Sequence, residues 1–262
     1  MKPTYAAVVA DLSAEYAELD AIVAALDDEA WSLPTPAPGW TVGDQVRHLA
    51  FSDARAREAL ADPDAFEASK GTNVGAAVQR ALDEARSLGP REVLAWWRDE
   101  RSWLLDLLEG ADPARRVPWY GPPMGVVSFA TARLMETWAH GQDVVDAVGA
   151  TRVPTARLRH VADIGVRAMP WSFTVHGLAV PTEPVRVELR GPDGDAWAWG
   201  ADGAASAVRG EALDFCLVVT QRRHPADVRL AVEGPVAEQW MAVAQAFAGP
   251  PGAGRSKGQF SS

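Results

Sequence analysis

The stretch Glu136-Thr-Trp-Ala-His140-Gly-Gln-Asp143 decides how the fold of this chain is interpreted. Its glutamate and histidine stand four residues apart, so on a helix their side chains project from the same face, one turn apart. A further histidine, His48, lies far upstream in a chain with only five histidines. Two ligands from one helix and one from another leave an open coordination position, which is the arrangement of a catalytic zinc site. We therefore predict that His48, Glu136 and His140 bind a divalent metal.

A solvated helix face is the alternative explanation of this pattern. At about 100° per residue, one side of this helix carries Phe129, Arg133, Glu136, His140 and Asp143. Two observations favour a cleft. The row includes a phenylalanine and follows the aromatic loop 117–124, and His48 lies away from the apolar stripe of its own helix. We expect both helices to have a second face that is at least partly buried.

Three more side chains are candidates for roles beside the metal. Asp143 lies one turn after His140, where it is a candidate to accept the proton of the distal imidazole nitrogen, to act as a fourth ligand, or to be a surface carboxylate. Trp119 and Tyr120 lie in a loop held by prolines. We expect these two rings to form the wall of a pocket that binds a cofactor or substrate.

Composition restricts the class of protein. Up to residue 150 there are 24 acidic and 13 basic residues, and after it 11 and 12. The acidic half lacks the basic stripe that phosphate backbones require, so we expect no binding to nucleic acid or to anionic membranes. One cysteine excludes an intramolecular disulfide and a multi-cysteine zinc site. No window approaches the roughly 20 apolar residues of a membrane span, and no signal peptide is recognisable, so we expect a cytoplasmic protein.

Apolar periodicity predicts an all-helical first half. Helical patterns cover 5–26, 41–60, 76–88, 91–108 and 126–148. Thr41 followed by Asp44 resembles a capping box at the start of the second pattern. Long helices with short connections predict a four-helix bundle, in which metal sites are built from side chains of facing helices. We place this domain at residues 1–150.

The second half changes from helical to alternating periodicity. Helices are predicted at 156–169, 211–219 and 236–247, and strands at 173–180, 185–189, 196–199 and 228–232,. We therefore predict a two-domain α+β chain, with a small α+β domain over 155–248. The tail 249–262 is rich in glycine and serine and is expected to be flexible,.

Two sequence blocks resemble the mycothiol-dependent maleylpyruvate isomerase family, within the DinB-like superfamily of metal-binding four-helix bundles. They are Pro38-Gly-Trp-Thr-Val-Gly-Asp-Gln-Val-Arg-His48-Leu and Glu136-Thr-Trp-Ala-His140-Gly-Gln-Asp143. The resemblance implies a DinB-like bundle in which His48, Glu136 and His140 bind zinc. It also implies a small second domain with an arginine important for activity near the end of a helix that begins with glycine. Arg222 or Arg223 occupies the comparable place. The C-terminal stretch from Ala237 resembles a distinct actinobacterial branch.

These observations together predict a metal-dependent enzyme. The expected metal is zinc, with nickel or iron as alternatives, because two histidines and a carboxylate suit all three. We expect it to activate a low-molecular-weight thiol, mycothiol by resemblance, for isomerisation or transfer on a small electrophilic substrate whose carboxylate pairs with Arg222 or Arg223. A metal-binding protein without turnover and a zinc-water hydrolase, with Asp143 or Asp44 as general base, are the alternatives. The sequence predicts no oligomeric state.

Overall fold

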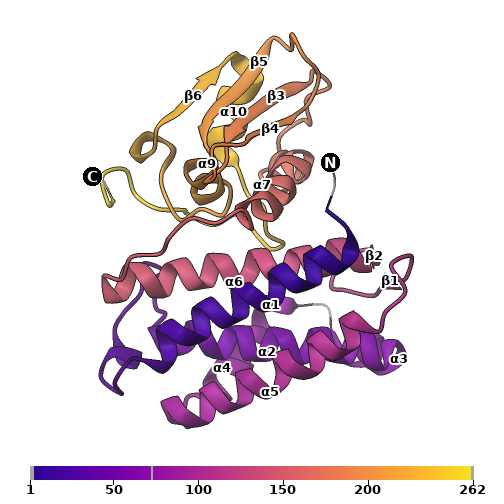
Figure 1. Cartoon of the computed structure of the whole chain (residues 1–262), viewed down its shortest axis with the longest axis vertical. Helices are drawn as coiled ribbons and strands as arrows, with labels where there is room; N and C mark the ends of the chain where they lie inside the picture. Colours follow the sequence, from indigo (N-terminus) through magenta and orange to yellow (C-terminus); the bar gives the residue numbers. More distant parts are fainter. Residues whose placement is uncertain (1–2, 72, 261–262) are drawn as a thin grey trace. The chain divides into compact units, whose positions relative to one another are not determined.

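Four long helices form the first part of the computed structural model, which describes residues 3–71 and 73–260 (Figure 1). They are α1 (Tyr5–Ala24), α2 (Val42–Ala61), α5 (Pro90–Glu109) and α6 (Val126–Val148). Helices α1 and α2 each pack against both α5 and α6, so the four close into a bundle. This bundle belongs to the first of two compact units, Met1–Thr151 and Arg152–Ser262.

Capping and apolar stripes explain where the bundle helices lie. The Thr41 hydroxyl accepts from the Asp44 backbone N–H, and the Asp44 carboxylate accepts from the Thr41 N–H, so the predicted capping box begins α2. Gly149 directly follows α6 and ends it, because its φ of +65° is a left-handed conformation that favours glycine,. The bundle core includes Leu12, Tyr16, Leu19, Val46, Leu49, Trp97, Leu104, Phe129 and Leu134, all at most 1% exposed.

Smaller elements complete the first unit. Helices α3 (Pro63–Ser69) and α4 (Val74–Ala85) connect α2 to α5 and pack against α2. Helix α3 was not predicted, although Asp62 caps it by accepting from the Ala65 N–H. A short 3-10 helix, η1 (Ala30–Ser32), precedes α2, and the strands β1 (Arg116–Val117) and β2 (Met124–Gly125) pair as a ribbon before α6.

A four-stranded sheet forms the centre of the second unit. Its order is β4-β3-β5-β6, from β3 (Val185–Arg190), β4 (Ala196–Trp199), β5 (Ser206–Glu211) and β6 (Leu230–Glu233). Strand β3 pairs antiparallel with β4 and parallel with β5, and β5 pairs antiparallel with β6. The predicted strands 185–189, 196–199 and 228–232 correspond to β3, β4 and β6.

Helices accompany this sheet. They are α7 (Leu158–Arg167), α8 (Met169–Val175), α9 (Ala212–Val219) and α10 (Pro235–Val243), and η2 (Pro225–Asp227) is a 3-10 turn. Helix α9 packs against α7, β3 and β5, and α10 packs against β5 and β6. The predicted class, a four-helix bundle followed by an α+β part, is confirmed.

One predicted strand is wrong. Residues 173–180 do not form a strand, because α8 occupies 169–175 and irregular chain follows it. Pro170 lies in the first turn of α8, where its missing N–H costs nothing,. The hydroxyls of Ser172 and Thr174 donate to carbonyls four residues earlier in the chain, which fits a helix as well as the alternating pattern fits a strand.

The C-terminal stretch makes specific contacts in the structure. The Gly258 N–H donates to both carboxylate oxygens of Asp227, and the Arg223 guanidinium lies 3.9 Å from the centre of the Phe260 ring. Flexibility of 249–262 stays a prediction. Across residues 3–71 and 73–260, the helices are all too short or too polar to cross a lipid bilayer.

Candidate metal centre

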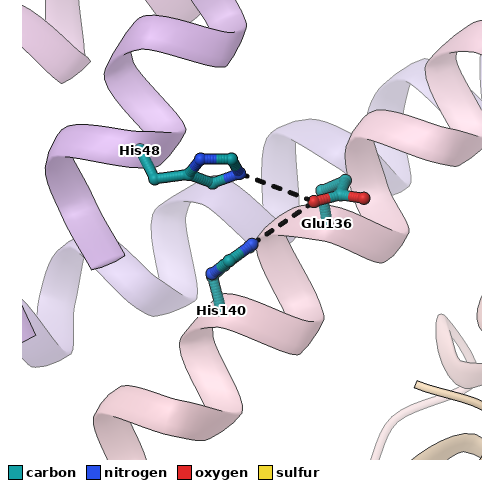
Figure 2. Close-up of side chains that lie close together, drawn as sticks. All are labelled: His48, Glu136 and His140. Atoms are coloured by element: carbon teal, nitrogen blue, oxygen red, sulfur yellow. Dashed lines mark ion pairs between the residues drawn. The ribbon is translucent and has the colours of Figure 1, made fainter. Parts of the chain in front are cut away.

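Three side chains from two helices of the bundle point toward one another (Figure 2). His48 lies on α2, two turns after the capping box that begins this helix. Glu136 and His140 lie one turn apart on α6. Because α2 packs against α6, residues that are distant in the sequence meet inside the first unit.

The donor atoms of these side chains converge. Nε2 of His140 lies 3.3 Å from Oε2 of Glu136, and Nε2 of His48 lies 3.8 Å from the same oxygen. One donor atom from each residue lies within 4.8 Å of the other two, and among the described residues this is the only such group of His, Cys, Asp and Glu. A tetrahedral ion with bonds of about 2.1 Å separates its ligand atoms by about 3.4 Å. The donor set and its spacing therefore fit a divalent metal.

The charge at the site favours a cation. Burial alone would raise the pKa of Glu136, but its contacts with His140 and His48 outweigh burial and hold this pKa well below its usual value. Glu136 therefore carries a negative charge opposite two imidazole nitrogens. The side chain of Glu136 keeps 24% of its surface exposed, so a small ion has access to the site.

A chain of hydrogen bonds fixes the orientation of His140. Nδ1 of His140 lies 2.5 Å from Oε1 of Gln45, whose Nε2 donates to the Thr35 hydroxyl. That hydroxyl donates in turn to the Trp40 carbonyl. The Trp40 ring stacks on His140, with the ring centroids 5.8 Å apart, and also packs against His48. Sequence analysis did not identify Gln45 or Trp40 as site residues.

The signal that would have found Gln45 is its position three residues before His48 on α2. This spacing gives the two side chains neighbouring positions on the helix surface. One turn on the other side of His48 is Ser52, whose hydroxyl lies 3.5 Å from Nε2 of His48. Polar side chains therefore flank the ligand candidate along α2 in both directions.

A buried ion pair lies beside the centre. Asp53 on α2 is fully buried and accepts hydrogen bonds from Tyr16 on α1, Trp97 on α5 and Arg133 on α6. Burial alone would lower the pKa of Arg133, but the charges of Asp53 and Glu136 and the hydrogen bond to Asp53 hold it above its usual value. Arg133 is 3% exposed and precedes Glu136 by one turn, so the polar row of α6 faces the bundle interior and the solvated-face alternative is wrong.

Trp119 and Tyr120 lie between β1 and β2, in an aromatic cluster. The Trp119 ring stacks on Phe66 and meets Phe129 edge-on, with centroids 5.5 and 5.1 Å apart. The Tyr120 hydroxyl accepts from Arg55 Nε and lines a cavity of about 200 Å³. The indole that packs against the two imidazoles belongs to Trp40. A cofactor-binding role for Trp119 and Tyr120 stays a prediction.

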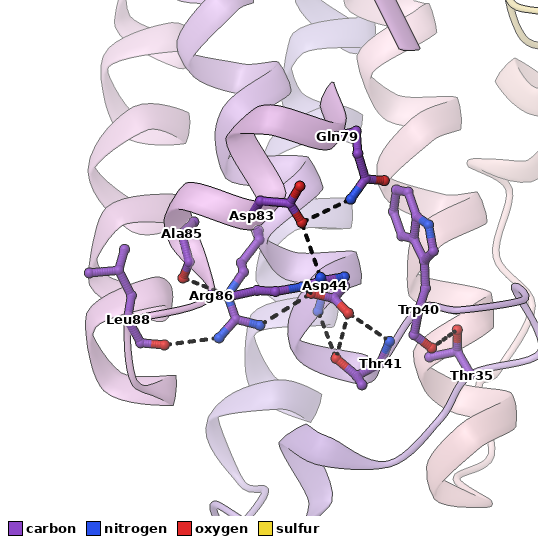
Figure 3. A network of polar contacts seen from close by, with 10 residues as sticks. Thr35, Trp40, Thr41, Asp44, Gln79, Asp83, Ala85, Arg86 and Leu88 are labelled. Carbon is purple, nitrogen blue, oxygen red and sulfur yellow. Dashed lines mark hydrogen bonds and ion pairs between the residues drawn. The ribbon is translucent and has the colours of Figure 1, made fainter. Parts of the chain in front are cut away.

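The Asp44 carboxylate takes part in a helix cap and in ion pairs away from the three converging side chains (Figure 3). Besides capping α2, its carboxylate lies 3.5 Å from Arg47 Nη1 and 3.7 Å from Arg86 Nε. Arg47 also donates to the carbonyls of Ala85 and Leu88, which ties α2 to the end of α4. Asp44 is therefore poorly suited to act as a general base.

The remaining candidates lie outside the three-residue group. Asp143 is 1% exposed, one turn after His140 on α6, and is not part of the group of converging donor atoms. Arg222 and Arg223 follow α9 in the second unit, where Arg222 Nη1 donates to the Thr220 carbonyl and Arg223 Nη1 to that of Arg222. The roles predicted for these residues stay predictions.

Comparison with known proteins places the bundle in a family. Residues 12–145 match the family model described as the mycothiol maleylpyruvate isomerase N-terminal domain. The chain belongs to the mycothiol maleylpyruvate isomerase family. This confirms the resemblance drawn from the two sequence blocks. Within the second unit, residues 181–233 match a model described as wyosine base formation.

Related proteins are similar over most of the chain. Uncharacterized proteins from two strains of Mycobacterium tuberculosis are 47% identical over 250 residues, which cover 94% of this chain and 97% of theirs. The crystal structure of the mycothiol-dependent maleylpyruvate isomerase matches with a TM-score of 0.63 at 15% identity, covering 89% of this chain and 95% of that one. The structure of a histidine-to-alanine mutant of that enzyme matches with a TM-score of 0.60 at 13% identity, over 84% and 90%.

Proposed function

We propose that this protein is a divalent-metal-dependent enzyme that uses mycothiol, or a similar small thiol, for isomerisation or S-transfer on a small electrophilic substrate. The observation that carries the proposal is the convergence of His48, Glu136 and His140. The chain that holds them belongs to the mycothiol maleylpyruvate isomerase family. Zinc is the expected metal, and nickel or iron would suit the same donors.

Each residue of the site has a proposed task. His48 and His140 would hold the ion through Nε2 and Glu136 through Oε2, which leaves room for a thiol or water,. A bound divalent cation stabilises the thiolate, the reactive form of a thiol, at neutral pH. Glu136 is ionised because its contacts with His140 and His48 hold its pKa low, and its negative charge favours a cation beside it.

Substrate binding is proposed for the arginine and aromatic candidates. Arg222 or Arg223 would pair with a carboxylate of the substrate, because a guanidinium makes two parallel hydrogen bonds with such a group. Trp119 and Tyr120 would provide an apolar wall. Asp143 would help to position His140, because it lies one turn after His140 on the same helix.

Metal analysis tests the first step of this proposal. Inductively coupled plasma mass spectrometry should find near-stoichiometric metal in the untagged wild type and none in His48→Ala or Glu136→Ala. His176→Ala, which removes a histidine of the second unit, is the matched control and should keep the metal. A wild type without metal after incubation with zinc would contradict the proposal.

Turnover separates the enzyme from its alternatives. The metal-loaded wild type should consume mycothiol, or isomerise a substrate in its presence, in a panel of small electrophilic acids and alkyl donors. Stoichiometric metal with no thiol-dependent reaction across the panel would favour a metal-binding protein without turnover. The hydrolase alternative is weakened because one of its two candidate bases, Asp44, is held by its cap and by two arginines.

A further inference from the structure

Gln45 is a buried amide in contact with one of the ligand candidates. Its side chain is 0% exposed on α2, and its oxygen Oε1 lies 2.5 Å from Nδ1 of His140 on α6. Its nitrogen Nε2 lies 2.9 Å from the Thr35 hydroxyl. A buried amide is costly unless both ends are hydrogen-bonded, and here both ends are.

The hydrogen-bond chain determines which way the amide points. The Thr35 hydroxyl has one hydrogen to donate. Its oxygen lies 2.9 Å from the oxygen of the Trp40 carbonyl, which can only accept,. The hydroxyl must therefore accept from Gln45, so the NH₂ group of the amide faces Thr35. This leaves the amide oxygen facing His140. The assignment does not depend on the similar shapes of the two amide ends.

The same logic determines the tautomer of His140. An amide oxygen cannot donate, so Nδ1 of His140 must carry the proton in this contact. In the neutral ring, the other nitrogen, Nε2, then has no hydrogen and carries a lone pair that can only accept. Nε2 is the atom that lies 3.3 Å from Oε2 of Glu136. Two acceptors at this distance repel each other unless a cation or a proton lies between them.

We propose that Gln45 is a positioning residue that holds His140 in the Nδ1–H tautomer and aims its Nε2 at a divalent metal. The assignment rests on the proposed function, because it gives Gln45 a role relative to that metal. Histidines that bind metals usually donate their second ring N–H to an oxygen acceptor, and loss of that acceptor typically weakens metal binding 10- to 100-fold. Gln45 supplies such an acceptor from the neighbouring helix.

The two histidines are held unequally. Nδ1 of His48 is buried and has no hydrogen-bond partner among the described residues, whereas Nδ1 of His140 has Gln45. His140 is therefore the ligand whose orientation is set before a metal arrives. Loss of Gln45 should reduce this difference, because the His140 ring could then rotate or change tautomer.

Zinc affinity tests the assignment without any need for a substrate. The dissociation constant is measured by competition with a chromophoric chelator for wild type, Gln45→Leu, Gln45→Glu and Gln142→Leu. Gln142 is the matched control, because it is a largely buried glutamine two residues after His140 whose amide donates to Asp146. We expect a 10- to 100-fold weaker constant for Gln45→Leu and no change for Gln142→Leu. Gln45→Glu keeps an acceptor and should restore most of the affinity.

A second variant and a spectroscopic measurement cover the case in which Gln45→Leu does not fold. Thr35→Val keeps Gln45 and removes the group that orients its amide, so a smaller weakening of the same sign is expected. Cobalt in place of zinc reports the ligand field, and its visible absorption bands should shift in Thr35→Val and Gln45→Leu but not in Gln142→Leu.

The outcomes distinguish a failure of the role assigned to Gln45 from a failure of the proposed function. Wild-type affinity and unchanged cobalt bands in Thr35→Val, and in Gln45→Leu where it folds, would overturn the role of Gln45 and leave the proposed function intact. Equal weakening in Gln45→Leu and Gln142→Leu would also overturn it, since the effect would then be general. A wild type that binds neither zinc nor cobalt would overturn the proposed function itself, and this assignment with it.

Discussion

Replacement of Arg133 by methionine should destabilise the bundle by about 3–5 kcal/mol, the usual cost of leaving a buried charge without its partner. Arg133 Nε donates to Asp53 Oδ1 at 3.0 Å, and Nη2 lies 2.9 Å from the same oxygen. Asp53 is 0% exposed, so water cannot take over the role of the guanidinium. Methionine fills much of the volume of the arginine stem, so the loss should come mainly from the charge and not from a cavity.

The matched control is Arg98→Met. Arg98 forms two hydrogen bonds with Asp20, but its side chain is 47% exposed, and exposed pairs contribute at most about 1 kcal/mol,. Urea unfolding followed by far-ultraviolet circular dichroism gives both free energies. For a unit of this size the buried variant should also lower the melting temperature by about 6–20 °C.

A double variant completes the test. Asp53→Leu combined with Arg133→Met removes both charges and should recover part of the loss, because no isolated charge then stays buried. Recovery should be incomplete, since Tyr16 and Trp97 also donate to Asp53 and would lose their acceptor. If Arg133→Met cost no more than Arg98→Met, the reasoning about burial would be refuted.

Three further perturbations have defined outcomes. The pKa of Asp20 is lowered, first of all by a hydrogen bond from Arg98. The stability that Asp20 contributes should therefore be fully present above its unfolded pKa of 3.8 and be lost as the pH falls through its folded pKa,. An acid titration of the unfolding free energy should therefore fall less steeply for Asp20→Asn than for wild type. Gly191→Ala would place its Cβ 2.6 Å from the Trp197 ring and should cost about 1–3 kcal/mol, seen as a lower melting temperature, whereas an unchanged melt would contradict the packing,. Thr41→Ala removes the side-chain acceptor of the capping box and should cost about 1 kcal/mol in urea unfolding, and no loss would mean that the cap is replaced by water,.

Periodicity predicts the long helices and also the short helix α9, but it does not predict α3 and misassigns α8. Residues 126–148 were predicted as a helix and form α6 with the same bounds, because a proline-rich loop and a terminal glycine mark both ends. Residues 173–180 were predicted as a strand, yet 169–175 form α8. A helix of two turns is too short for alternation and helical periodicity to be told apart. The hydroxyls of Ser172 and Thr174 bond to carbonyls one turn earlier, which is compatible with the helix that forms.

The three converging side chains are predictable from the sequence, because two of them share one helix and the third is a histidine on a second predicted helix. Glu136 and His140 were paired from their spacing on a single helix, and His48 was added as the histidine of a facing helix. Gln45 and Asp53 were not found, because their partners lie on other helices. Such contacts depend on how each helix is rotated about its axis and shifted along it, which a single sequence does not specify. A polar residue one turn from a ligand candidate is the local signal to look for.

The buried pair of Asp53 and Arg133 also has a consequence for the alignment of the bundle. It connects α2 and α6 five residues after His48 and three residues before Glu136. A slip of α6 by one turn, about 5.4 Å, would break this pair and at the same time carry Glu136 and His140 past His48. An apolar pair at these positions would tolerate the slip, because apolar contacts are not directional. We therefore expect the ion pair to hold α2 and α6 in register, so that its main contribution is the alignment of the three converging side chains and not stability.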